Sequence, residues 1–378
     1  MGDDLPPAMT GTVTGAFKGA MPRIAVSRIP AMKRVFSGLL FAMLLGLAAL
    51  WMRLSRPESI APPPESEVEL TAVEKGTTYK VHGGNAYRVE PRTGRWEFVQ
   101  RVYDPGFYAK HYVERDGAIF RKDDNGALVP MRRSFADGFE NATRLADLIG
   151  PERGWTSCAL QSPRAPTVAD YVALRNRILR ADADFLDNRL EPGDERPHGG
   201  KTSLKASSVP PARGMVTAKA SLSTELLHFV KGDDVWASLW CLVPADGGMP
   251  FTVWDLETTW IENHPGIRVA IADGRHVCLQ LKSLGNPYYR QPRGKEVEFP
   301  RGRWVRLRVH LGLTEADDGV IEVWQDDQKI IDTRGRTLVL ASAIYNSLEV
   351  GITACNEQGR TTTLFVDDVS ISTKPPDD

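Results

Sequence analysis

Two neighbouring runs of residues, 302–311 and 319–328, constrain the fold of this chain most strongly. From residue 305 onward the first run alternates valine and leucine with arginine and histidine, a period of two that is typical of a strand with one buried face. The second run repeats the alternation, with Val320 as its one interruption. The connection at 314–319 is rich in turn residues. The two runs therefore predict consecutive long strands of an antiparallel meander.

Composition limits the class of protein. The chain has 378 residues, is 42% hydrophobic and carries nine tryptophans, enough for one large core with a small module beside it. A net charge of −1 gives no reason to expect nucleic acid as a partner. The four cysteines show no CxxC spacing, so zinc and redox motifs are not expected. Cys241 and Cys278 lie in apolar strand patterns and are read as small core residues, although disulfides stay open for an exported domain.

The N-terminal part of the chain carries a candidate membrane anchor. Residues 1–34 are rich in Gly, Ala, Pro and Met and are expected to form a disordered cytoplasmic arm. Residues 35–52 contain no charge and would span about 27 Å as a helix, the thickness of a bilayer core. The excess of basic residues before this segment predicts a single-pass protein with a cytoplasmic N terminus and a periplasmic or extracellular C-terminal part. A cleaved signal peptide is the alternative, but no small-x-small site follows the apolar run.

Between the apolar segment and the long strands we expect a spacer and a small module. Residues 53–67 are proline-rich and predict an extended spacer. Residues 68–133 predict a small β-rich module with two hairpins, which turn at 91–94 and 123–126. Its aromatic residues could form a sugar-stacking surface or the core of the module; they are Tyr103, Phe107, Tyr108, Tyr112 and Phe120.

Residues 134–373 predict an all-β, two-sheet antiparallel sandwich. Strand-like segments separated by Gly, Pro and Asp turns fill this region, at 199–206, 216–229, 234–243, 251–259, 267–272 and 276–282. Only 165–187 reads as helix, with Thr167 as its cap. Nearly helix-free chains of this length with long strands are typical of jelly-roll sandwiches.

Five motifs carry a resemblance to a known family. They are Phe-Ala-Asp-Gly-Phe-Glu at 135–140, His-Gly-Gly-Lys-Thr-Ser-Leu at 198–204, Gly-Asp-Asp-Val-Trp at 232–236, Gly-Arg-Trp-Val at 302–305 together with 319–327, and Phe-Val-Asp-Asp-Val-Ser-Ile at 365–371. Their order resembles the concanavalin A-like jelly roll, and within it is most similar to polysaccharide lyases of the heparin lyase I and glucuronan lyase type. The resemblance implies a concave sheet that binds an acidic glycan. In such lyases a cation or amide offsets a uronate carboxylate, a Tyr or His removes the C5 proton, and a Tyr protonates the leaving oxygen.

The candidate site residues follow from this chemistry, because the C5 proton is weakly acidic until the neighbouring carboxylate is offset. We expect His310, Tyr289 and Tyr288 as catalytic residues. Substrate-binding candidates on the polar sides of the strands or in nearby loops are Arg268, Gln280, Lys282, Arg290, Arg306, Arg308 and Trp324. A plain solvated face explains the same pattern equally well.

Several alternatives to an acidic-polysaccharide lyase stay open. The family's Tyr-x-Lys run is absent from the penultimate strand, which reads Asn-Ser-Leu-Glu-Val-Gly-Ile at 346–352. Asp255 and Glu257 point to one side of their strand, and paired carboxylates are typical of glycoside hydrolysis. A non-catalytic carbohydrate-binding module and an envelope scaffold are further readings.

A structural calcium ion is the one cofactor expected. Many sandwiches of this group tie the first strand to the last through calcium, and Asp137, Glu140 and Asp368, with Asp367 beside them, are oxygen ligands of the kind calcium prefers. Capping of strand ends is the alternative role for these carboxylates.

Overall fold

The computed structural model describes residues 59–376, apart from 75, 124, 273–274 and 284–286. The predicted arm at 1–34 and the predicted transmembrane helix at 35–52 lie outside the described residues. Within the described part, no helix is both long and apolar enough to span a bilayer. Residues 58–378 cluster as one compact unit.

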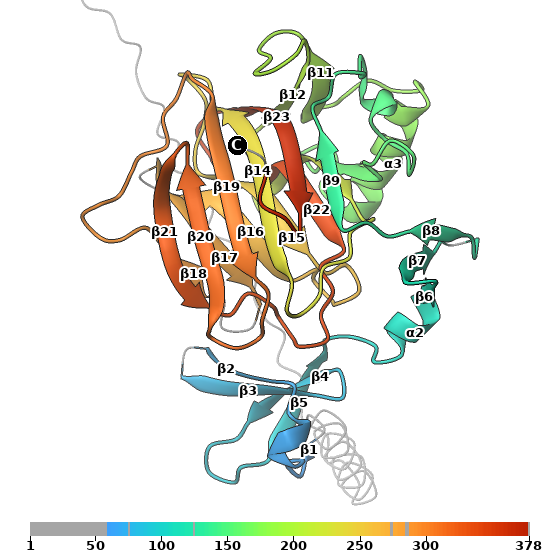
Figure 1. Cartoon of the computed structure of the whole chain (residues 1–378), viewed down its shortest axis with the longest axis vertical. Coiled ribbons are helices and arrows are strands. Elements are labelled where there is room, and N and C mark those ends of the chain that lie inside the picture. The colour runs from blue at the N-terminus through green and yellow to red at the C-terminus, as the bar shows by residue number, and fades with distance from the viewer. Residues whose placement is uncertain (1–58, 75, 124, 273–274, 284–286, 377–378) are drawn as a thin grey trace, which may run out of the picture. The chain divides into compact units, whose positions relative to one another are not determined.

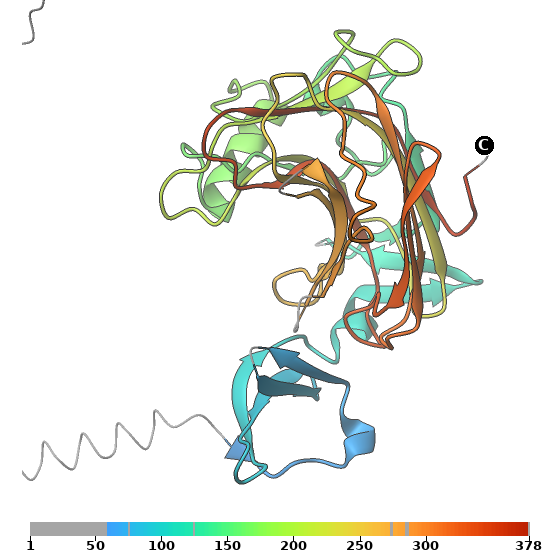
Figure 2. The same ribbon diagram turned by 90° about the vertical axis from the view of Figure 1, so that its left-hand side faces the viewer.

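Two large antiparallel sheets form the sandwich (Figure 1). The first sheet, called here the concave sheet, has the order β10-β13-β22-β15-β16-β17-β18. Its strands are β10 (Ser157–Ala159), β13 (Ala218–Thr224), β22 (Ser347–Cys355), β15 (Phe251–Glu257), β16 (Gly266–Ile271), β17 (Val277–Lys282) and β18 (Tyr288–Tyr289). Figure 2 shows this sheet bent into an arc.

The second sheet, called here the outer sheet, has the order β11-β12-β23-β14-β19-β20-β21, and β9 pairs with β23 beside this path. Its strands are β11 (Arg189–Gly193), β12 (Ser203–Ser208), β23 (Thr362–Ser372), β14 (Asp234–Leu242), β19 (Val305–Gly312), β20 (Gly319–Gln325), β21 (Gln328–Gly335) and β9 (Ser134–Asp137). The predicted meander is confirmed, since β19 pairs with β20 and β20 pairs with β21, all antiparallel.

The core lies between the two sheets. Along β19 the apolar residues are buried and the residues between them are half-buried, as the alternation predicted. The inward faces of β16 and β17 contribute residues such as Val269 and Leu279 to the same core. Cys241 is a buried free thiol of this core, as read from the sequence. Cys278 is also buried and free, but it lies on the same side of β17 as Gln280, outside the core between the sheets. Because the sheets pack apolar face to apolar face, their polar faces lie on opposite sides of the sandwich.

The small module contains two sheets of its own. One has the order β1-β5-β4-β3-β2, formed by β1 (Ser59–Ile60), β2 (Leu70–Glu74), β3 (Thr77–His82), β4 (Asn85–Val89) and β5 (Trp96–Arg101). The other has the order β6-β7-β8, formed by β6 (Tyr112–Arg115), β7 (Ala118–Lys122) and β8 (Leu128–Pro130). Both predicted hairpins are present, as β4–β5 and β7–β8. The end of the expected spacer is only partly extended. β1 pairs with β5, and the 3-10 turn η1 (Glu65–Glu67) interrupts the extended backbone after it.

The predicted long helix exists in a shorter form. After the short elements α2 (Phe107–His111) and η2 (Leu145–Asp147), α3 runs from Val168 to Leu179. Thr167 caps it as expected, exchanging hydrogen bonds with Asp170 in a capping box. The helix stops before 187 because Ala181 takes a positive φ and the Asp182 N–H bonds back to the Arg177 carbonyl at 2.8 Å, a Schellman-type end.

Candidate functional site on the concave sheet

A single register row of polar residues crosses all seven strands of the concave sheet. Strand pairing aligns its members as direct neighbours, in the order Ser157, Ser223, Glu349, Asp255, Arg268, Gln280 and Tyr288. Directly opposed residues in a sheet project to the same side. The row therefore lies on the face away from the core, because the residues between its members, such as Val269 and Leu279, belong to the core. This face is the inner side of the arc that the sheet forms in Figure 2.

A second row runs beside the first, two residues further along the strands. It aligns Ser347, Glu257, Gly266 and Lys282 on β22, β15, β16 and β17. Gly266 places no side chain between Glu257 and Lys282, and these two residues form an ion pair across the intervening strand. The absence of a side chain on β16 thus permits a contact that sequence spacing alone does not suggest.

Six charged side chains gather at the middle of these rows and are called here the central cluster. Three are the carboxylates of Asp255, Glu257 and Glu349, which are 2%, 6% and 6% exposed and whose oxygens lie within 4.8 Å of one another. Each is paired with a different cation. Lys219 Nζ lies 3.0 Å from Glu349 Oε2, Arg268 Nε lies 3.4 Å from Asp255 Oδ1, and Lys282 pairs with Glu257.

Burial and charge crowding set the protonation of the central cluster. Burial, followed by repulsion from Glu257, raises the pKa of Asp255 to about 7, although Arg268 opposes the shift. Burial alone would lower the pKa of Lys219, but the attraction of Glu349 and the other two carboxylates raises it above its ordinary value. The cluster therefore keeps its lysine charged while one carboxyl group exchanges a proton near neutral pH.

A recess opens beside the central cluster, between α3 and the connection from β15 to β16. Tyr171 and Arg175 of α3 line one side of this recess, and His264 of the connection lines another. Lys219, Glu257 and Glu349 also line it. Burial raises the pKa of Tyr171, which makes its hydroxyl a poor base, whereas His264 is exposed. An imidazole thus stands at the edge of the cluster, where it can reach a bound molecule.

The candidate residues predicted from the sequence divide between two faces. Arg268, Gln280, Lys282 and Tyr288 lie on the concave face in the two rows. The Arg290 guanidinium lies over the Tyr288 ring, 5.1 Å from its centroid. Tyr289 points to the other side of β18, where its hydroxyl donates to the Arg336 carbonyl at 2.9 Å and its ring packs against the core.

The other four candidates lie on the polar face of the outer sheet. Arg306, Arg308 and His310 alternate with the buried residues of β19, and Trp324 stands opposite Arg308 on β20. His310 stacks on Trp236 at 3.9 Å between ring centroids and forms hydrogen bonds with Glu322 and Asp234 at 2.7 and 2.9 Å. The structure therefore does not bring these residues together with Arg268 and Lys282, because the whole core lies between the two groups.

Sequence reasoning missed part of the central cluster. Lys219 and Glu349 of this cluster are not among the predicted candidates, and neither are Ser221 and His264, which lie beside it. One signal was present: Glu349 is a charged residue inside the otherwise largely apolar run 348–352. In the structure Ser221 and Lys219 both hydrogen-bond this carboxylate.

The residues expected to hold calcium are occupied by N–H donors. Asp137 accepts from Phe139 N at 2.8 Å and from Trp155 Nε1 at 2.5 Å, and Glu140 accepts from two amides of the 201–202 segment. Asp368 faces His198 Nδ1 at 2.9 Å. These bonds join the 198–202 segment to Glu140, just after β9, and to Asp368 of β23, and the calcium stays a prediction.

Within the described ranges, one group has the geometry to hold a metal ion, and it is Asp255, Glu257 and Glu349. Carboxylate oxygens are the ligands that hard divalent cations prefer. The three cationic side chains already paired with these oxygens compete for the same lone pairs, so the donor set fits an internal charge network better than a metal.

Comparison with known proteins gives similarity of fold. No protein-family model matches the chain, and no curated protein matches it. Among solved structures, the endo-β-1,4-glucuronan lyase of the fungus Trichoderma reesei is similar at 11% identity and a TM-score of 0.46, covering 64% of this chain and 96% of that one. The cellulose-induced protein Cip1 is 14% identical with a TM-score of 0.40, covering 64% and 98%.

The alginate lyase Aly36B is 10% identical with a TM-score of 0.37, covering 64% of this chain and 97% of its own. The search therefore returns a glucuronan lyase and alginate lyases, the type of protein that the sequence motifs resemble. At these identities and TM-scores the likeness supports no statement about the activity of this chain.

Proposed function

We propose that the concave face binds an acidic polysaccharide and that the central cluster cleaves it by β-elimination. The observation that carries the proposal is the row of polar side chains across all seven strands, with three buried carboxylates at its middle that are each paired with a half-buried cation. A row of this length matches a linear chain lying across the strands. An exported domain anchored by residues 35–52 is part of the same proposal, because extracellular polysaccharide is then within reach.

Arg268 is the cation best placed to receive a uronate carboxylate. Its contact with Asp255 is the longest of the three pairs, at 3.4 Å, and Asp255 Oδ1 has no hydrogen-bond partner among the described residues. A uronate arriving beside the cluster adds negative charge, which raises the proton affinity of Asp255 further. Protonated Asp255 loses its attraction for Arg268, so the guanidinium becomes available to the substrate.

The proposed reaction assigns one group to each proton. His264 removes the C5 proton, and the electron pair of that bond forms the C4–C5 double bond. The bond between C4 and the glycosidic oxygen breaks, and protonated Asp255 donates its proton to the leaving oxygen. Arg268 and Lys282 offset the charge that develops on the uronate carboxylate. A pKa of about 7 suits Asp255 to donate near neutral pH.

Glycoside hydrolysis is the second candidate, and a specific observation favours it. Asp255, Glu257 and Glu349 place carboxyl oxygens within 4.8 Å of one another, and one of these groups holds a proton near pH 7. An acid beside an ionised carboxylate is the pair that hydrolysis requires. In this reading Asp255 is the acid, and Glu257 or Glu349 attacks the sugar or activates water.

One experiment separates these functions. The purified protein is incubated with glucuronan, alginate and a neutral glucan, while new reducing ends and the ultraviolet absorbance of an unsaturated uronate are both followed. Elimination produces both signals, and hydrolysis produces reducing ends alone. Retention on a uronate polymer with neither signal would indicate a binding module, and indifference to every polymer would contradict the proposal.

A further inference from the structure

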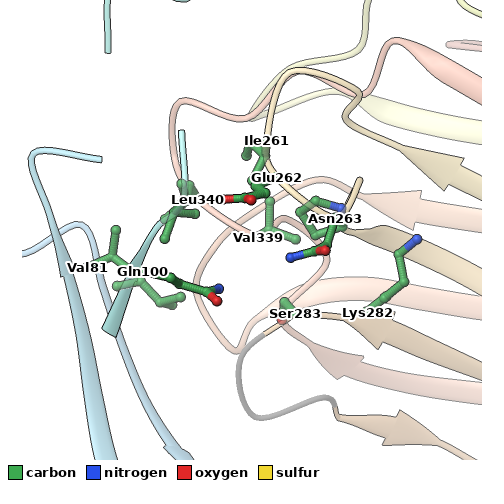
Figure 3. Close-up of a pocket in the computed structure, with 12 residues that line it drawn as sticks. Val81, Gln100, Ile261, Glu262, Asn263, Lys282, Ser283, Val339 and Leu340 are labelled. Atoms are coloured by element: carbon green, nitrogen blue, oxygen red, sulfur yellow. The ribbon is translucent and has the colours of Figure 1, made fainter. Parts of the chain in front are cut away.

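A pocket lies where the small module meets the strands that carry the central cluster (Figure 3). Val81 of β3 and Gln100 of β5 form its wall on the module side. Asn263 and Lys282 contribute from the connection after β15 and from the end of β17. Its volume is about 260 Å³, close to the lower end of ligand pockets at roughly 300 Å³, which suits one sugar ring and its substituent rather than a length of polymer.

The segment that follows β5 attaches the small module to the sandwich beside this pocket. The Glu262 N–H donates to the Val102 carbonyl at 2.8 Å, and Tyr103 forms a bridge with Ile261. The Tyr103 ring packs edge-on against Trp260, with 5.2 Å between centroids. These contacts join the segment after β5 directly to the segment after β15, so the pocket walls come from two parts of the chain that are bonded together.

The lining combines an apolar floor with two facing amides. Ile261, Val339 and Leu340 are buried apolar residues of the pocket. Gln100 and Asn263 are exposed, and Figure 3 shows their side-chain amides pointing toward one another. In the part of the chain that the structure describes, neither amide has a hydrogen-bond partner. Asn263 holds a positive φ of 65°, a conformation that asparagine tolerates better than most residues.

The two amides and the apolar floor together match a ligand group that has both hydrogen-bonding atoms and a methyl group. Each amide offers a donor N–H and an acceptor oxygen, and the floor offers apolar surface for a methyl group. An acetamido group on a sugar presents an N–H, a carbonyl oxygen and a methyl group in one small unit. A uronate by itself would bring a second charge to Glu262, which also lines the pocket, and would leave the apolar floor unused.

The position of Lys282 links the pocket to the central cluster. Lys282 lines the pocket, while its ammonium group pairs with Glu257 inside the cluster. A sugar in the pocket is therefore a neighbour of a sugar at the cluster. We propose that this pocket is a subsite for an N-acetylhexosamine, and that the polysaccharide is a copolymer in which uronate and N-acetylhexosamine residues are adjacent. The copolymer part of this inference rests on the function proposed above.

The test measures the affinity of the full chain for three ligands. They are a glucuronate–N-acetylhexosamine copolymer, a uronate homopolymer and an N-acetylhexosamine oligomer without uronate. Gln100→Ala removes one amide, and Val99→Ala is the matched control on the same strand, at a residue that is 47% exposed and does not line the pocket. We expect Gln100→Ala to weaken binding of both acetamido ligands about five- to tenfold, the value of one or two hydrogen bonds, and to leave the homopolymer unaffected.

The outcomes separate the subsite from the proposed function. Equal affinity of wild type and Gln100→Ala for the copolymer and the oligomer would overturn the subsite, while homopolymer binding that depends on Arg268 would leave the proposed function intact. Binding of the oligomer through Gln100 without binding of any uronate polymer would support the subsite and contradict the function. Each comparison also requires that Gln100→Ala unfolds at the same temperature as the wild type. We expect this result because Gln100 is exposed.

Discussion

Lys282 of β17 pairs with Glu257 of β15 across β16, where Gly266 stands between them in the register. Most cross-strand pairs join adjacent strands. This contact reaches over a strand because Gly266 has no side chain that would separate the two residues. The glycine therefore shapes the central cluster without contributing a functional group to it.

Replacing Gly266 with alanine is expected to disrupt this arrangement. A Cβ there would lie 2.7 Å from Glu257 Cα and closer still to the Leu256 carbonyl oxygen, so the backbones of β15 and β16 must move apart. We expect a loss of about 2–3 kcal/mol in the free energy of unfolding, measured by denaturant titration. Gly302→Ala is no suitable control, since its φ is 77°, whereas Gly193→Ala meets nothing within 4 Å and should cost under about 1 kcal/mol.

The stability of the protein should fall as pH rises toward neutrality because of Asp255. Its pKa is about 7 in the folded protein against an ordinary value near 4, so the folded state binds the proton more tightly than the unfolded state. This contribution is complete below about pH 4 and is lost as pH rises through about 7. Relative to Asp255→Asn, the wild type should lose about 1 kcal/mol per pH unit between pH 5 and 7.

The measurement is a series of denaturant titrations across this pH range. Asp246→Asn, in an exposed connection, is the control and should keep the slope of the wild type. A wild-type slope equal to that of Asp255→Asn would show that the carboxyl group titrates normally.

Removing one partner of the ion pair between Lys219 and Glu349 should destabilise the protein more than removing both partners would suggest. Glu349→Gln leaves a largely buried ammonium group with weaker partners and is expected to cost about 3 kcal/mol in the free energy of unfolding. Lys219→Met should cost a similar amount, since it leaves Glu349 unneutralised. The double variant should cost clearly less than the sum of the two, and strict additivity in the double-mutant cycle would argue that the pair is not coupled.

Glycan binding should depend on the concave face and not on the outer sheet. Arg268→Ala removes a charge-assisted contact and is expected to weaken binding of a uronate polymer roughly 10- to 100-fold. Arg308→Ala removes the same type of side chain from the opposite polar face and should change the affinity less than about twofold. Affinity chromatography on the immobilised polymer measures both, and the reverse order of effects would move the site to the outer sheet.

Local patterns were sufficient for the strands and for several boundaries. The alternation from residue 305 to 311 fixes which side of β19 is buried, because side chains on a strand alternate regardless of its neighbours. The Thr167 cap and both hairpins depend on residues close in sequence, and they too are found as predicted. The anchor proposed at 35–52 lies outside the described residues and keeps the status of a prediction.

The candidate site could be predicted only in part. Sequence identified Arg268, Gln280 and Lys282 as polar strand residues, but Arg306 and Arg308 show the same pattern on the other sheet. No local signal distinguishes the polar face of the concave sheet from the polar face of the outer sheet, since both alternate with a buried face.

The sequence by itself determined the strands, their buried sides and the all-β class, because these depend on side-chain periodicity and turn chemistry. Only the tertiary structure decided which polar residues meet. Asp255, Glu257 and Glu349 come together because β15 pairs with β22, two strands that are nearly 100 positions apart in the chain, and Lys219 joins them through β13. Strand order and register are properties of long-range pairing, and they alone convert scattered charges into a buried cluster with a shifted pKa.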